Sequence, residues 1–263
     1  MDLYNFNPET VLSFMLTLFR ISLVVFLLPY FGGEAIPRTV KAALCVVLTL
    51  GLWPYLAFEG SYLPQHPFQI AVWLFGELML GLVLGLTVRF LIASIQTGGQ
   101  IIGFQMGFAM VNVVDPITGV SEAVTAHFLY MTSMLTFLAL NGHLYLLRGL
   151  TQSFELVPPG ALFISPELVT QIIYLSGQIF VLAVKIAAPI ITAVFLVNLG
   201  LALISRAAPQ MNVLLLGFPL KIAIGFLFLG MVFEIMSIYV AEFINTLGAG
   251  FYNLLRAGTV GLQ

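Results

Sequence analysis

The sequence predicts an all-α, polytopic integral membrane protein. Of its 263 residues, 60% are hydrophobic and only 8% are charged, whereas soluble domains carry about 25% charged residues. The mean hydropathy is +1.09, and a protein folded in water cannot hide that much apolar surface because it needs a polar exterior. The composition therefore excludes an ordinary soluble enzyme and a disordered chain. The 9 Lys and Arg residues are scattered, so they also cannot form the basic patch that a nucleic-acid partner requires.

Six apolar runs support this fold class. A helix that crosses a bilayer needs about 20 mostly apolar residues, and each run is close to that length or longer. In order, the runs span residues 10–31, 40–58, 68–95, 123–147, 168–204 and 213–247. The last two exceed one crossing, so each predicts either one long tilted helix or a hairpin of two shorter helices. Pro189 could break the fifth run, and Gly225 and Gly230 could bend the sixth.

Five ionisable residues lie well inside these runs, where a charge costs at least about 2.5–3.5 kcal/mol at the bilayer centre. They are Arg20, Glu77, Lys185, Lys221 and Glu234. The charges could pair within a bundle or face water, as in a transporter, or the helices could pack against other subunits of a large assembly. The three basic side chains could instead snorkel if they lie near helix ends. Glutamate is too short to snorkel far, and we expect Glu234 or Lys221 to pair with a neighbour in this chain or in a partner.

Gly81 and Gly85 lie one helical turn apart in the third run and form a small-xxx-small face. Such a face lets two helices approach closely. The sequence leaves open whether the second helix belongs to this chain or to a partner.

The segment at residues 98–122 differs from the rest of the chain because it is rich in glycine and contains an Asp-Pro turn signal at Asp115. Four large side chains alternate with smaller or polar ones, the period-2 pattern of an extended segment: Phe104, Met106, Phe108 and Met110. A helical stripe ending at Val111 fits as well, but the glycines favour non-helical backbone. Such backbone survives at membrane depth only when it is buried in protein or lines an aqueous cavity. The segment therefore predicts either a deformable seal or a core loop without a gating role.

No catalytic, cofactor or metal site is expected. His66, His127 and His143 are far apart in the sequence and lack metal-ligand spacing. The single cysteine, Cys45, lies in an apolar run and is expected to be a buried hydrophobic side chain. No phosphate-binding glycine motif or nucleophile elbow appears.

Two segments resemble those of a known family. The first is GFQMGFAM at residues 103–110, followed by Asp115 and Pro116. The second is SRAAPQMNV at residues 205–213, followed by GFPLK at residues 217–221. Together with the Ala-Ile-Pro turn that ends at Pro37 and the chain length, they resemble the FliR/SctT family of type III secretion export-gate proteins over nearly the whole chain. The second segment is specific, because Arg-x-x-Pro-Gln-x-Asn is a polar interruption in a hydrophobic protein.

The resemblance implies an export-gate subunit of the bacterial inner (cytoplasmic) membrane, at the flagellar basal body. In this family the subunit assembles with FliP and FliQ into a helical complex of long, kinked helical hairpins, much of it raised out of the bilayer plane. FlhA and FlhB are further expected partners, and membrane lipid is a neighbour. The complex is a passive conduit for unfolded flagellar proteins, with energy supplied by an ATPase and the proton-motive force.

The resemblance also implies roles for parts of the chain. Residues 1–263 would form one export-gate domain, with a plug-like loop at residues 97–122 and a polar motif at residues 205–221. The plug that seals the closed pore would comprise Phe104, Met106, Phe108, Met110, Val111 and Val113. The polar motif, on the cytoplasmic side at a subunit contact, would comprise Arg206, Pro209, Gln210 and Asn212. Apart from the resemblance, the positions of Glu77, Lys185, Lys221 and Glu234 in the apolar runs predict charges within the membrane or between subunits.

Two other interpretations stay open at this point. The chain could belong to the homologous gate of a virulence injectisome, which shares the mechanism but serves another machine. It could also be a small secondary transporter or ion channel that uses Glu77, Lys185, Lys221 and Glu234 as an ion path.

Overall fold

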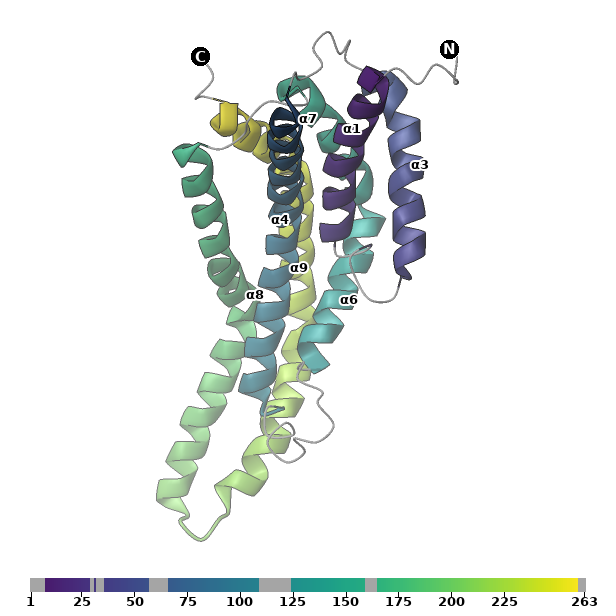
Figure 1. Ribbon diagram of the computed structural model, residues 1–263. Coiled ribbons are helices and arrows are strands. Elements are labelled where there is room, and N and C mark those ends of the chain that lie inside the picture. The colour runs from purple at the N-terminus through teal and green to yellow at the C-terminus, as the bar shows by residue number, and fades with distance from the viewer. Residues whose placement is uncertain are drawn as a thin grey trace. The chain divides into compact units, whose positions relative to one another are not determined.

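The computed structural model describes residues 8–28, 31, 36–56, 66–108, 124–158 and 165–259, and every regular element in these ranges is an α-helix (Figure 1). The helices are α1 (Pro8–Leu27), α3 (Arg38–Leu56), α4 (Pro67–Met106), α6 (Val124–Ala139), α7 (Gly142–Leu156), α8 (Pro166–Ala207) and α9 (Val213–Thr259). Within these residues, four helices are long and apolar enough to cross a membrane: Pro8–Leu27, Pro67–Met106, Pro166–Ala207 and Leu215–Gly258. The predicted all-α membrane fold is confirmed.

Three of the long helices begin at a proline. Pro8, Pro67 and Pro166 are the first residues of α1, α4 and α8, where the missing N–H of proline would have no partner in any case. Ser165 supplies a side-chain cap for α8, because its Oγ accepts a hydrogen bond from the backbone N–H of Leu168 at 3.0 Å. The start of α8 is therefore set by its local sequence.

The fifth and sixth apolar runs are single long helices rather than hairpins. Pro189 lies inside α8 and Pro219 inside α9, and Gly225 and Gly230 are also helical. Of the two alternatives that the sequence left open, the single long helix is correct, since proline is tolerated in long apolar helices when neighbouring groups satisfy the freed carbonyl. The two helices are joined by a short turn at residues 208–212.

The fourth apolar run, in contrast, is two helices. The expected single run at residues 123–147 is interrupted between α6 and α7, where Asn141 adopts a left-handed conformation with φ of 57°. Asparagine is one of the few residues that visits this region routinely. The α6 and α7 segments are therefore separate elements of 16 and 15 residues.

The chain divides into two compact units. Unit 1 comprises residues 1–90, 141–175 and 244–263, and unit 2 comprises residues 91–140 and 176–243. Unit 1 contains α1, α3 and α7, and α1 packs beside α3 (Figure 1). At that contact, the rings of Phe14 and Trp53 meet edge to face at 5.9 Å, and Trp53 Nε1 donates a hydrogen bond to Ser13 Oγ at 3.2 Å.

The glycine pair of the third run faces α1 of the same chain. A Cβ added at Gly81 would lie 2.8 Å from Leu23 Cβ, and one added at Gly85 would lie 2.5 Å from Leu27 Cβ. Both distances are shorter than ordinary contacts, so no larger side chain fits without movement. Of the two explanations that the sequence left open, packing within the chain is therefore correct.

The glycines near the end of α4 also serve helix packing, within unit 2. A Cβ at Gly99 would lie 2.5 Å from Ala126 Cα, and one at Gly98 would lie 3.1 Å from the carbonyl oxygen of Ala183. Thr125 joins the same contact by donating a hydrogen bond to Gly99 O at 2.7 Å. The expected non-helical backbone is wrong for residues 98–106, because these glycines allow neighbouring helices to approach and do not break α4.

Candidate functional site

A buried ion pair joins α1 and α4 within unit 1. Arg20, in the middle of α1, and Glu77, in α4, are 0% and 1% exposed. Arg20 Nε donates a hydrogen bond to Glu77 Oε2 at 2.5 Å, and Nη2 donates to Oε1 at 2.9 Å. This two-point contact is the strongest form of arginine–carboxylate pairing.

The remaining donors of Arg20 reach α7. Nη1 donates to the carbonyl oxygen of Ser153 at 3.0 Å, and Nη2 donates to the carbonyl oxygen of Val157 at 3.1 Å. The guanidinium carbon also lies 4.1 Å from the centre of the Phe154 ring, within the range of a cation–π interaction. One side chain therefore links α1, α4 and the end of α7.

Of the possibilities that the sequence left open for Arg20, pairing inside the bundle applies and snorkelling to the membrane interface does not. Its position in the middle of α1 places the guanidinium far from either helix end, and pairing replaces hydration. A signal for this pair was present in the sequence, because one basic and one acidic residue occur in separate apolar runs. Sequence reasoning did not join Arg20 to Glu77, since nothing local indicates which two runs pack together.

The other charges of the apolar runs lie in unit 2 and differ in their surroundings. Lys185 is exposed, with Nζ 5.9 Å from the centre of the Tyr239 ring. Glu234 is exposed, and Lys221 is half-buried. Within the described ranges, none of the three forms an ion pair. The expectation that Glu234 or Lys221 pairs with a neighbour therefore stays a prediction.

The polar motif of residues 205–221 forms the end of α8, the turn, and the start of α9. Arg206 lies in the last turn of α8, where a basic side chain complements the helix dipole. Asn212 caps α9, because its Oδ1 accepts a hydrogen bond from the backbone N–H of Leu215 at 3.3 Å. Pro209 and Gln210 form the turn between them, and all four residues are exposed.

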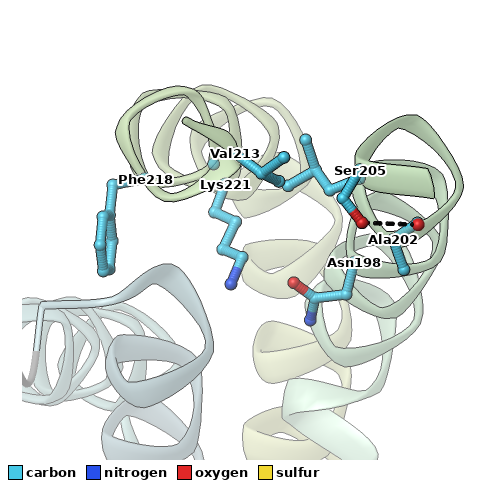
Figure 2. Close-up of a pocket in the computed structure, with 8 residues that line it drawn as sticks. Asn198, Ala202, Ser205, Val213, Phe218 and Lys221 are labelled. Atoms are coloured by element: carbon cyan, nitrogen blue, oxygen red, sulfur yellow. Dashed lines mark hydrogen bonds between the residues drawn. The ribbon is translucent and has the colours of Figure 1, made fainter. Parts of the chain in front are cut away.

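A pocket of about 340 Å³ lies between α8 and α9 beside this motif, entirely within unit 2. It is lined by Asn198, Leu201, Ala202, Ser205, Val213, Gly217, Phe218 and Lys221. Figure 2 shows the amide of Asn198 pointing toward the ammonium end of Lys221, while the Phe218 ring points away from both. The Ser205 hydroxyl donates to the carbonyl oxygen of Ala202 at 2.8 Å, within its own helix. Asn198 was not identified from the sequence, because it lies outside the recognised motifs.

Three of the six expected plug residues are described, and they are not equivalent. Phe104 is 68% exposed, and Met106 is 0% exposed. Met106 packs against α9, because a Cβ at Gly225 would lie 2.6 Å from its side chain. Phe108 is half-buried in the turn that follows α4. The remaining three, Met110, Val111 and Val113, lie outside the described residues.

Gly107, the first residue after α4, has φ of +89°, a left-handed conformation that favours glycine. Phe218 of α9 lies directly over it, since a Cβ at Gly107 would be 2.8 Å from Phe218 Cδ1. The end of α4 is therefore fixed to α9 by two contacts, one at Met106 and one at Gly107.

The helices α8 and α9, which are long enough to cross a membrane, carry many exposed apolar side chains within unit 2. On α8 they include Phe180, Phe195, Leu196, Leu199 and Leu203, and on α9 they include Leu216, Leu220, Phe226, Leu227 and Met231. Exposed apolar area on this scale marks contact with a membrane or with other proteins.

No group of three or more His, Cys, Asp or Glu side chains that could hold a metal ion occurs among the described residues.

Comparison with known proteins gives a consistent result. The family described as bacterial export proteins, family 1, matches residues 11–247. The flagellar biosynthetic protein FliR of Escherichia coli (strain K12) is 30% identical over 239 residues, which cover 90% of this chain and 89% of that protein. FliR of Bacillus subtilis (strain 168) is 33% identical, with 82% and 84% covered. The Yop proteins translocation protein T of Yersinia pestis is 32% identical, with 70% and 72% covered.

Proposed function

Because the chain belongs to the bacterial export proteins, family 1, we propose that it is a subunit of a type III protein export gate. The family match over residues 11–247 is the observation that carries this proposal. With FliP and FliQ, the subunit forms the channel through which unfolded proteins cross the inner membrane. It acts as a passive part of the conduit, and FlhA and FlhB supply further contacts at the gate.

The exposed surface of unit 2 supports membership in an assembly. Side chains such as Phe195 and Leu227 are 63% and 77% exposed, and water is a poor neighbour for so many apolar groups. Lipid chains and the helices of partner subunits are the two kinds of neighbour that cover such surfaces with little cost in free energy. The exposed polar turn with Arg206 and Asn212 between α8 and α9 suits the aqueous cytoplasmic side of such an assembly.

The share of this chain that aligns with each relative favours a flagellar machine over an injectisome. The flagellar relative from Escherichia coli aligns with 90% of this chain, whereas the Yersinia pestis relative aligns with 70% at a similar identity. The flagellar gate is therefore the first candidate, and the injectisome gate is the second.

The buried ion pair counts against a transporter that uses Glu77 as an ion site. Both oxygens of the Glu77 carboxylate accept hydrogen bonds from Arg20. An ion path would require this carboxylate to release Arg20, and the separation of two buried, hydrogen-bonded charges costs several kcal/mol. We propose a structural role for Glu77 instead.

The end of α4 supports a more specific form of the plug. Met106 anchors the segment to α9, and the proposed seal comprises Phe108 and, further along the chain, Met110, Val111 and Val113. Phe104 lies on the exposed side of α4 and faces the lumen or a partner subunit. Methionine and phenylalanine side chains close around a pore without specific hydrogen bonds, so they block ions and yield to any polypeptide.

Purification from native membranes tests the proposed function. The full chain, carrying a C-terminal tag in its own bacterium, is expected to bring FliP and FliQ with it, and deletion of its gene is expected to abolish flagellar filaments. Loss of virulence secretion with intact motility would assign the chain to an injectisome. Recovery of the chain alone, with transport of a small solute in proteoliposomes, would refute the export-gate proposal.

A further inference from the structure

The pocket between α8 and α9 combines a cation with polar and apolar walls. Lys221 contributes an ammonium group and Asn198 an amide, and both face the pocket (Figure 2). None of the described residues that line it is acidic. Within the described part of the chain, Lys221 has no salt-bridge partner. The polar part of the pocket therefore offers hydrogen-bond donors to a negatively charged group.

The remaining walls are apolar. Leu201, Ala202, Val213 and Phe218 line the pocket beside Lys221. The surface next to it is also apolar, because Leu203 and Leu216 are 61% and 50% exposed. A ligand that fits both parts has an anionic head and hydrocarbon chains.

The pocket lies near one end of two helices that are long enough to cross a membrane. Lys221 is eight residues beyond Val213, the first residue of α9, which corresponds to about 12 Å along the helix axis. The lysine side chain can extend back toward the polar turn. Arg206, exposed at the end of α8, adds a second cation at the same end of the hairpin. Basic pockets between membrane helices are suited to anionic lipid headgroups.

We propose that this pocket binds the phosphate of an anionic phospholipid, with Lys221 and Asn198 as donors and the acyl chains along the exposed apolar faces of α8 and α9. The donors, the lack of a carboxylate among the described lining residues and the adjoining apolar surface favour a lipid over an acidic side chain of another protein. The proposal does not depend on the export role, because it requires only that the hairpin end lies at a membrane surface.

A lipid titration of the full chain, purified with the subunits that accompany it, tests the site. The probes are short-chain phosphatidylglycerol, phosphatidylcholine of the same chain length, and inorganic phosphate. Binding is measured by native mass spectrometry and by the shift in unfolding temperature. We expect phosphatidylglycerol to bind and stabilise the protein, and the other two probes to do neither.

The variant Lys221→Met should bind phosphatidylglycerol about fivefold more weakly, the effect of removing one cation near an anionic lipid, while Lys221→Arg should retain binding. Lys185→Met is the matched control, because Lys185 lies on α8 beside Tyr239 and away from the pocket lining, and it should bind as the unaltered protein does. Asn198→Leu provides a second test if Lys221→Met does not fold.

Three results would overturn the proposal. The first is equal affinity of Lys221→Met, or of Asn198→Leu if it is used instead, and the unaltered protein for phosphatidylglycerol. The second is equal binding of phosphatidylcholine or effective competition by inorganic phosphate, since the pocket would then not recognise an anionic lipid. The third is a carboxylate–amine crosslink from Lys221 to an acidic residue of a partner subunit in the purified complex, because that residue would then occupy the pocket.

Discussion

Arg20 places all of its hydrogen-bonding capacity inside unit 1. Its partners are the Glu77 carboxylate, the hydroxyl of Ser153 and two carbonyl oxygens at the end of α7. A buried charge is stable only when such partners replace its lost hydration. The residue is therefore a structural link between helices that are distant in the sequence, and its removal leaves Glu77 without its main counter-charge.

The substitution Arg20→Leu is expected to destabilise the protein by about 3–5 kcal/mol, because Glu77 is left buried without its cation. Glu77→Leu is expected to cost less, since Arg20 keeps its two carbonyl partners. The double variant Arg20→Leu with Glu77→Leu is expected to lose only about 1–3 kcal/mol, the cost of the Val157 carbonyl without its arginine donor, since the Ser153 carbonyl still accepts a hydrogen bond from the Val157 N–H.

Unfolding in detergent micelles, followed by circular dichroism, measures these three losses in one double-mutant cycle. Lys185→Leu, at an exposed position, is the control for removing a cation from an apolar helix. If the double variant is as unstable as the sum of the two single variants, then the pair has no coupling and Arg20 acts through packing alone.

At the level of single residues, the sequence identified the charges but not their partners. The cost of burying Glu77 was evident from its position in an apolar run. Which helix supplies the counter-charge depends on tertiary packing, and Arg20 is 57 residues away in the sequence. The polar motif was more predictable, because Asn212 at the start of an apolar run is a recognisable helix cap.

The helices of this chain meet closely where glycine replaces a side chain. Gly81 and Gly85 of α4 lie against α1 in unit 1, and Gly98 and Gly99 lie against neighbouring helices in unit 2. Small residues allow close backbone approach in membrane helices. Long apolar helices therefore gain specific packing from these sites, in addition to general hydrophobicity.

Substitution of Gly85 by alanine is expected to destabilise unit 1 by about 1–3 kcal/mol, because the added Cβ would overlap Leu27 of α1. Gly51→Ala in α3 is the matched control, since a Cβ there meets no atom within 4 Å, and it should be neutral or stabilising by up to about 1 kcal/mol. Thermal unfolding of both variants in the same detergent provides the comparison. Equal effects at the two positions would show that the α1–α4 contact is not tight.

Element lengths were only partly predictable from the sequence. Six apolar runs were evident, but the position of Asn141 in a left-handed turn and the continuation of α8 through Pro189 were not. Glycine is ambiguous in a sequence, because the same residue breaks a helix in one context and lets a second helix approach in another. At Gly98 and Gly99 the second role applies, which explains why the predicted irregular backbone was wrong there.

The chain consists of two compact units, and both expose large apolar side chains. Unit 1 holds the buried ion pair, and unit 2 carries the exposed apolar faces of α8 and α9 and the end of α4. The proposed assembly and seal both depend on unit 2. The family could be predicted from two short segments of the sequence, but the exposed surface could not, because exposure depends on which helix faces are left uncovered.

Replacement of Phe108 and Met110 by glycine is expected to make the closed gate leak small ions, because the apolar constriction would lose the side chains that exclude water. Met110 lies outside the described residues, and Phe108 lies in the turn after α4. Ion uptake by cells or proteoliposomes that contain the assembled gate measures the leak. Normal ion permeability in a variant that still co-purifies with its partners would favour a core loop without a gating role.

The ion pair of unit 1 also has a consequence for synthesis. Glu77 is 57 residues beyond Arg20, so a ribosome that adds about 5–20 residues per second completes it about 3–11 s later. The carbonyl groups of Ser153 and Val157 emerge later still. During that interval the Arg20 guanidinium of the nascent first helix lacks these partners. The first helix can therefore reach its final position only after α4 and α7 have been synthesised.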